Sequence, residues 1–314
     1  MARYIVGRCL QLVPTLLGIS IICFFLIRLV PGDPALAILG ISATPDDIEY
    51  IRELYGLDKP VFIQYIIWVK KVLCLDFGKS IYSNEDISGI LISRVPVSFQ
   101  LALLSMFISL SISMPAGIIS AVKRNSFLDR LICIFTTAGI SIPGFWLGII
   151  LIYVFGVVFP VFPLYGFVNI FSDFTEGLKH LFLPAFTLGL SLASFTCRMT
   201  RAGMIGVLNE NYIITARAKG LKEATVITKH AFRNTLIPLT TVIGIQTGTV
   251  LGGSALIEVV FALPGLGRLL VDSIFTRDYP VVQIIVLLYA IMFVLINLLS
   301  DILYTFLDPR IVYS

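Results

Sequence analysis

Seven basic side chains gather between residues 198 and 233, in a chain otherwise dominated by apolar residues. The part from 211 to 232 reads NYIITARAKGLKEATVITKHAF, and the whole stretch holds only two acids, Glu210 and Glu223. Clustered bases of this kind can bind anionic lipid headgroups or dock another protein. The stretch therefore predicts a binding surface rather than a catalytic centre.

A short helix is expected inside this stretch, over residues 209 to 220. Asn209 or Asn211 can serve as its N-cap, and Gly220 can end it. At 1.5 Å per residue the helix is only about 15 Å long, too short to be stable alone and too polar to span a membrane. It must lie along a membrane surface, as a connector on lipid or as a docking lever, and the residues alone leave both interpretations open.

Other residue types that could do chemistry lack the spacing that the chemistry needs. His180 and His230 have no second ligand at metal-binding spacing. The segment DFGKS lacks the glycine that a phosphate loop places five positions before Gly78, and neither H-E-x-x-H nor G-x-S-x-G occurs in the chain. No catalytic residue and no metal site are expected, so the chain is not expected to be an enzyme.

The elements that must position the basic stretch are membrane helices. Of the 314 residues, 57% are hydrophobic and 13% charged, with a mean hydropathy of +0.96, which is outside the balance of soluble domains. Six charge-free runs can each hold a spanning helix, which takes about 20 apolar residues. The sequence predicts an all-α membrane protein, one transmembrane domain over residues 1–314 with six transmembrane helices. The spans are expected at about 9–30, 97–122, 131–158, 181–197, 235–257 and 281–303.

Loop charges assign the two sides of the membrane, because cytoplasmic loops carry an excess of Lys and Arg. The N-terminus carries two arginines and no acid, and the loops 123–130 and 198–233 are basic. The segment 31–94 holds nine acids against six bases and is expected outside, as two or three short helices. The N- and C-termini are then both cytoplasmic.

A second polar region follows the fifth span. Its sequence PGLGRLLVDSIFTRDYP predicts a tight turn at Pro264 to Gly267, a short helix, and a stop at Pro280. Glu258 precedes it as the one acid at the end of a span. The region can be a surface connector with Glu258 as a surface anchor, or it can belong to an outer gate.

Two glycines of the fifth span, Gly244 and Gly248, lie four residues apart on one helix face, with Thr247 beside them. Small residues at this spacing let membrane helices approach closely. Helix packing is the expected role of this face, and a polar pore lining is the alternative.

Several short motifs run in order along nearly the whole chain. They are PGDPA (31–35), LYGLDKP (54–60), LDFGKS (75–80), SIPGFWLG (141–148), LPAFTLG (183–189), PGLGRLLVDSI (264–274), RDYP (277–280) and DPRI (308–311). Together they resemble the permease subunits of binding-protein-dependent ABC importers, in the branch for dipeptides, oligopeptides, glutathione and nickel. The basic stretch is similar to the family's EAA loop, which reads Glu-Ala-Ala, three residues, then Gly. Ala216 and Gly220 fit that pattern, whereas Ile214 and Thr215 replace its first two positions.

The resemblance implies the type I ABC importer permease fold with a cytoplasmic coupling helix. Its expected partners are a second homologous permease that completes a heterodimer, two ATPase subunits, an external solute-binding protein and the lipid membrane, without nucleic acid. ATP and Mg²⁺ are expected on the ATPases, because this chain has no G-x-x-x-x-G-K-[ST] run and needs no cofactor of its own. The expected location is a bacterial or archaeal cytoplasmic membrane.

The resemblance also assigns roles to the candidate residues. The helix near 209–220 would sit in a cleft of one ATPase, and its small alanines would allow close approach. The coupling residues are then Asn211, Tyr212, Ala216, Arg217, Ala218, Lys219 and Gly220. The residues of an outer gate, or of a contact with the binding protein, are Glu258, Pro264, Gly265, Gly267 and Arg268.

The expected function is that of the pore-forming subunit of an ATP-driven importer of small peptides. A charge-poor pore suits small zwitterions, since desolvating a bare charge is costly. Import of chelated nickel is the alternative. An ion-coupled secondary transporter is less favoured, because the centres of all six spans lack Asp, Glu, Lys and Arg.

Overall fold

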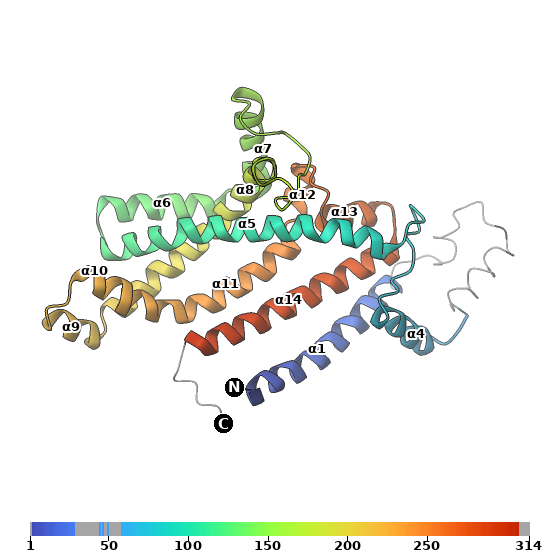
Figure 1. Cartoon of the computed structure of the whole chain (residues 1–314), viewed down its shortest axis with the longest axis horizontal. Helices are drawn as coiled ribbons and strands as arrows, with labels where there is room; N and C mark the ends of the chain where they lie inside the picture. The colour runs from blue at the N-terminus through green and yellow to red at the C-terminus, as the bar shows by residue number, and fades with distance from the viewer. Residues whose placement is uncertain (1, 29–43, 45, 47–48, 50–57, 308–314) are drawn as a thin grey trace.

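The computed structural model describes residues 2–28, 44, 46, 49 and 58–307 (Figure 1). Within this part the secondary structure is helical, apart from an isolated bridge between Lys79 and Asp86. The expected all-α class is confirmed. Most of the expected external segment up to residue 57, and the C-terminal tail from residue 308, lie outside the described residues.

The helices follow one another along the chain with short connections. They are α1 (Ala2–Arg28), α4 (Val61–Leu73), α5 (Ile87–Val122), α6 (Phe127–Ser141), α7 (Gly144–Ile152), η1 (Tyr153–Val158), α8 (Phe174–Leu208), α9 (Asn211–Ala218), α10 (Glu223–Thr225), η2 (Val226–Phe232), α11 (Arg233–Gly253), α12 (Ala255–Val260), α13 (Leu266–Phe275) and α14 (Tyr279–Leu307). The two η segments are π-helical. In Figure 1, α9 and α10 lie at the left end of the bundle, and α4 and α13 lie toward the right end.

Four helical stretches are long and apolar enough to cross a membrane, namely α5, α8, α14 and the continuous run from α10 to α11. The expected span 131–158 is not one straight helix, because α6 and the following α7 and η1 meet at a bend of 98°. Pro143 lacks an N–H and forces Ile142 into an extended conformation, with ψ of 123°. The first span is represented by a shorter apolar helix, Leu10–Phe25, so six crossings remain a prediction.

Helix boundaries extend well beyond the apolar runs. The second span was expected from 97, but α5 begins at Ile87; α8 begins at Phe174 and continues to Leu208. Arg198 and Arg201, expected in the cytoplasmic loop, therefore lie inside α8. A side-chain cap fixes the start of α8. Asp173 accepts hydrogen bonds there from the backbone N–H groups of Thr175 and Glu176, each at 3.0 Å.

The centre of the bundle is the long contact between α5 and α8. Glycines permit it: a Cβ on Gly189 would lie 2.8 Å from the carbonyl oxygen of Ser105, and one on Gly117 would lie 2.6 Å from Cβ of Thr200. Such close approach is typical of membrane helices. The pair forms the rigid frame on which both ends of the bundle are built.

On the expected outer side, α4 is one of the predicted short helices and packs against α1. The hydroxyl groups of Tyr65 and Ser20 lie 2.7 Å apart, and Phe24 contacts the rings of Tyr65 and Trp68. Aromatic contacts of this kind bury a large area at a small entropic cost. The external segment is thereby fixed to the first helix.

Candidate functional site

The helix α9 occupies the cationic stretch. Asn209 or Asn211 was expected as its N-cap, but neither occupies that position. The N-cap residue is Glu210, whose side chain makes no capping hydrogen bond. Its end is as predicted: Gly220 has a φ of +77°, its N–H donates to the Arg217 carbonyl at 2.9 Å, and the N–H of Leu221 donates to the Ala216 carbonyl. These two bonds form a Schellman motif, which a glycine with positive φ favours.

One face of α9 is fixed to the rest of the chain. Ile213 and Ala216 are buried in a cluster that is formed with residues of α5, α8 and η2. Those residues are Ala121, Met204, Val226 and Ala231. Ala216 therefore contacts its own chain, which corrects the expectation that its small size allows a partner to approach.

Two polar contacts complete this attachment. Asn234 donates from Nδ2 to the hydroxyl of Tyr212 at 3.0 Å, and Arg217 pairs with Glu223 at 2.6 Å. The hydrogen bonds that Arg217 donates to the Glu223 carboxylate raise the pKa of the Arg217 guanidinium. The positive charge of Arg217 is thus partly neutralised within the chain.

The other face of α9 and the turn after it point away from the bundle. Ile214 is 57% exposed and Leu221 is 41% exposed. Ala218, Lys219 and Gly220 are also exposed, and Tyr212 is about half exposed. An apolar surface bordered by lysines can enter a partner's cleft whose rim is acidic.

At the opposite end, Glu258 is fully buried. Its Oε1 accepts from the hydroxyl groups of Ser98 at 2.7 Å and Ser254 at 2.9 Å, and its Oε2 accepts from the backbone N–H of Arg268 at 3.0 Å. This corrects the expectation of a surface anchor. A buried carboxylate is tolerated when several donors surround it, so Glu258 joins α12 to α5 and to the start of α13.

The glycines of the PGLGR motif make room for this arrangement. A Cβ on Gly265 would lie 2.6 Å from the Ser98 hydroxyl, and one on Gly267 would lie 2.5 Å from Cα of Ala255. Ser98 in turn accepts from the N–H of Leu266 at 2.8 Å. Glu258 and Ser98 together satisfy free N–H groups of the first turn of α13.

The predicted short helix after the turn is confirmed as α13. It ends before Arg277, which has a φ of +58°, and Pro280 lies in the first turn of α14 instead of stopping α13. Pro264 is half-buried, and Arg268 donates from Nη1 to the Ala262 carbonyl at 3.0 Å. The five predicted residues of this region therefore surround one turn.

A contact that the sequence did not suggest holds the far end of α13. The hydroxyl of Ser80 donates to the buried carboxylate of Asp278, and the N–H of Ile81 donates to it at 3.1 Å. These bonds connect the end of DFGKS to the start of RDYP. Both motifs are thus structural, because they secure the external segment to the junction of α13 and α14.

Gly244 and Gly248 on α11 face α14 of the same chain. A Cβ on Gly244 would lie 2.7 Å from Cβ of Ser300, and one on Gly248 would lie 2.8 Å from Cε2 of Phe293. The hydroxyl of Thr247 donates to the Ile243 carbonyl at 2.7 Å. The geometry favours helix packing for these glycines.

Gly244→Ala is expected to destabilise the chain by about 1–3 kcal/mol, because a Cβ cannot rotate away and α11 and α14 must separate. Thermal unfolding of the purified protein in detergent measures the loss. Gly252→Ala is the matched control on the same helix, since an added Cβ there has open space. Equal melting temperatures for the two variants would contradict the close packing.

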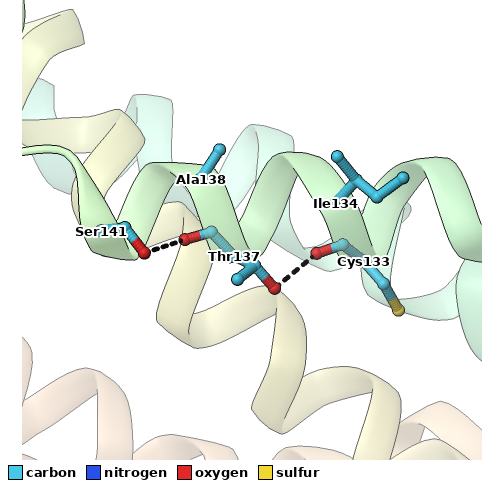
Figure 2. A pocket seen from close by; sticks show the side chains of 5 residues that line it. All are labelled: Cys133, Ile134, Thr137, Ala138 and Ser141. Atoms are coloured by element: carbon cyan, nitrogen blue, oxygen red, sulfur yellow. Dashed lines mark hydrogen bonds between the residues drawn. The ribbon is translucent and has the colours of Figure 1, made fainter.

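A shallow hollow of about 340 Å³ lies on the exposed side of α6 (Figure 2). Its lining residues are Cys133, Ile134, Thr137, Ala138 and Ser141. The hydroxyl groups of Thr137 and Ser141 donate to the carbonyls of Cys133 and Thr137, at 2.8 and 2.9 Å. Their donors are thus used within the helix, and the hollow presents a mainly apolar surface.

A buried ion pair between α6 and α8 was also missed. Asp129 is 3% exposed, and Arg201 donates to it from Nε and Nη2, both at 2.8 Å. The N–H of Asn125 donates to the same carboxylate at 2.8 Å, and Ser126 caps α6 by accepting from the N–H of Asp129. The spacing Ser-x-x-Asp is close to a capping box, a sequence signal that could have identified Asp129.

Metal binding has no support in the described residues, which contain no group of three or more His, Cys, Asp and Glu side chains suited to an ion. His180 bonds through Nδ1 to the Glu176 carbonyl at 2.8 Å, and the His230 carbonyl accepts from Asn234. Both histidines therefore have local structural contacts.

Comparison with protein families covers most of the chain. Residues 113–313 match the model described as binding-protein-dependent transport system inner membrane component, and residues 1–102 match the model of the N-terminal region of such membrane components. The match extends over α9, the Glu258 region and the buried pair at Asp129. The sequence resemblance is therefore confirmed.

Individual relatives are similar over their full length. The glutathione transport system permease protein GsiC of Escherichia coli (strain K12) is 42% identical over 314 residues, 100% of both chains. A Brucella abortus (strain 2308) protein that is named for a peptide transport system permease is 41% identical, again over 100% of both chains. Among solved structures, the inward-facing MetNI methionine ABC transporter has a TM-score of 0.57 at 21% identity, covering 70% of this chain and 96% of that chain. This last similarity shows a shared fold.

Proposed function

Because the chain belongs to the family of inner membrane components of binding-protein-dependent transport systems, we propose that it forms half of the pore of an importer for small peptides, glutathione included. It is an ABC importer permease, and ATP is hydrolysed on partner subunits. The observation that supports this choice of cargo is the identity of 42% over the whole length to a glutathione permease. The apolar spans support it, since a zwitterion is cheaper to desolvate than a bare ion.

The α9 end is proposed to couple the pore to an ATPase. Tyr212, Ala218, Lys219 and Gly220 belong to the exposed surface, whereas Ala216 and Arg217 attach α9 to its own chain. Asn211 begins the helix. Because α9 is packed and hydrogen-bonded onto its own chain, a displacement of α9 by the ATPase would be transmitted to α5, α8 and α11.

The α13 end is proposed to face outside and to receive cargo from the solute-binding protein, with α9 and both termini in the cytoplasm of a bacterial or archaeal cell. Glu258, Pro264, Gly265, Gly267 and Arg268 hold α13 in place. Since Glu258 is buried, it positions the outer element and does not touch the binding protein. A second homologous permease completes the pore.

The complex reconstituted with its partner permease, ATPases and binding protein is expected to hydrolyse ATP faster when glutathione or dialanine is added. The reason is that closed, loaded binding protein favours the ATP-hydrolysing arrangement of the complex. If nickel with a chelator stimulated ATP hydrolysis and peptides did not, the chain would be assigned to metal import. Uptake that does not depend on ATP but depends on an ion gradient would instead support a secondary transporter.

A further inference from the structure

The turn between α5 and α6 carries three bases that no acid neutralises. Lys123, Arg124 and Arg130, called the loop bases below, are all exposed, and none of them forms an ion pair with another of the described residues. The acid nearest to them in sequence, Asp129, is turned inward, where both of its oxygens accept from Arg201. The loop bases therefore present an uncompensated positive charge to their surroundings.

Backbone hydrogen bonds hold the loop bases near one another. The N–H of Ser126 donates to the Lys123 carbonyl at 3.1 Å, and the N–H of Arg130 donates to the Ser126 carbonyl at 3.1 Å. Asn125 lies in the turn with a φ of +64°, and its N–H is fixed to Asp129 at 2.8 Å. A fixed cluster of this kind suits a phosphate group, which an arginine binds through two parallel hydrogen bonds.

The hollow on α6 continues directly from Arg130 (Figure 2). Counted from Arg130, its lining residues follow at positions +3, +4, +7, +8 and +11, which is the spacing of one helix face. At 1.5 Å per residue this face is about 16 Å long, close to the depth of one leaflet of a hydrocarbon core that is about 30 Å thick. It ends at Ser141, where the chain bends by 98°. The face thus joins a phosphate-binding cluster to an apolar surface as long as one leaflet is deep.

We propose that this face binds an anionic phospholipid, with one acyl chain along the hollow and the headgroup phosphate at the loop bases. Charge selects the occupant, because several fixed bases attract an anionic headgroup more strongly than a neutral one. A helix of the second permease suits the face less well. Ile134 projects from it with 67% exposure, and the hydroxyl groups of Thr137 and Ser141 donate within α6, so the face favours neither close backbone approach nor hydrogen bonds donated to another helix.

The charge arm of the test uses the complex of this chain with its partner permease and ATPases. The delipidated complex is titrated in detergent with phosphatidylglycerol or phosphatidylcholine, and bound lipid is counted by native mass spectrometry. The wild type is expected to bind phosphatidylglycerol more tightly. Arg130→Gln is expected to weaken the tightest phosphatidylglycerol site about fivefold, the contribution of one base beside an anionic lipid. Arg233→Gln, at an exposed arginine that begins α11, is the matched control and is expected to bind as the wild type does.

The hollow itself is tested with Ala138→Phe, which fills it and leaves the charges unchanged. This variant is expected to bind one phosphatidylglycerol fewer than the wild type. Ile140→Phe adds a ring to α6 outside the hollow and is expected to bind the full number. Unchanged binding by Ala138→Phe would overturn the site, and so would equal weakening by Arg130→Gln and Arg233→Gln, since a general surface charge would then explain the binding.

Loss of the second permease from the Ala138→Phe complex, with lipid binding retained, would assign the face to that subunit and overturn the lipid site. The inference goes beyond the proposed function and depends on it only for the leaflet, which is the cytoplasmic one. Lipid binding is measured without cargo or ATP. A complex that no peptide stimulates would therefore reject the proposed function and leave the lipid site standing.

Discussion

Gly220→Glu is expected to abolish ATP-driven uptake while the chain still inserts into the membrane. With its φ of +77°, Gly220 adopts a conformation in which a side chain costs about 1–2 kcal/mol. An added Cβ would meet no heavy atom within 4 Å, so glutamate would project from the end of α9 and leave the core intact. A projecting acid would block docking in a cleft, and uptake of labelled dipeptide should fall by at least about 30-fold, as for an unmatched charge in an interface.

Gly206→Glu is the matched control for this experiment. Gly206 is exposed near the C-terminal end of α8, shortly before α9. An added Cβ there also has open space, and Gly206 does not have the positive φ of Gly220. It is expected to retain uptake within about twofold, as most exposed substitutions do. Gly220→Ala separates backbone strain from a projecting charge, since it carries only the first. Normal uptake by Gly220→Glu would reject the coupling role of α9.

Local features of the bundle could be predicted because short-range physics fixes them. The apolar runs define α5, α8, α11 and α14, since a membrane helix needs only length and apolar composition. The end of α9 at Gly220 follows from the conformational freedom of glycine. The turn before α13 could be predicted in the same way, because its proline and glycines favour a tight turn.

The break at Pro143 shows where local rules stop. Pro115, Pro184 and Pro238 lie inside continuous helices, whereas Pro143 separates α6 from α7 by a sharp bend. All four lack an N–H, and neighbouring helices decide whether the freed carbonyl is satisfied without a break. That outcome depends on tertiary packing, so the sequence could not distinguish them.

The surroundings of Glu258 were beyond prediction for a similar reason. Its donor Ser98 is 160 residues away in the chain, and a lone acid at the end of a span is more often solvated than buried. Ala216 was misjudged in the same way, because its small size suits either a partner or the chain's own core. The sequence could predict that Glu258 and Ala216 belong to the two candidate sites. It could not predict which side chains they contact.

Arg201→Ala is expected to lower the free energy of unfolding by about 3 kcal/mol, because it leaves the buried carboxylate of Asp129 without its bidentate partner. The value lies at the low end for buried pairs, since the Arg201 side chain is 28% exposed. Thermal unfolding in detergent provides the measurement. Arg198→Ala, three residues earlier on α8 and exposed, is the matched control and is expected to change little.

The cause of that loss can be isolated with Asp129→Asn combined with Arg201→Met. A buried charge is costly only when its partner is removed, so replacing both partners by neutral side chains of similar shape should recover much of the stability that Arg201→Ala loses. The side-chain amide introduced by Asp129→Asn could still accept from the Asn125 N–H through its oxygen and donate from Nδ2 to the hydroxyl of Ser120, which bonds the other oxygen of the native carboxylate. A double variant as unstable as Arg201→Ala would show that Arg201 acts through the packing of its side chain, and that the charge of Asp129 has little part in joining α6 to α8.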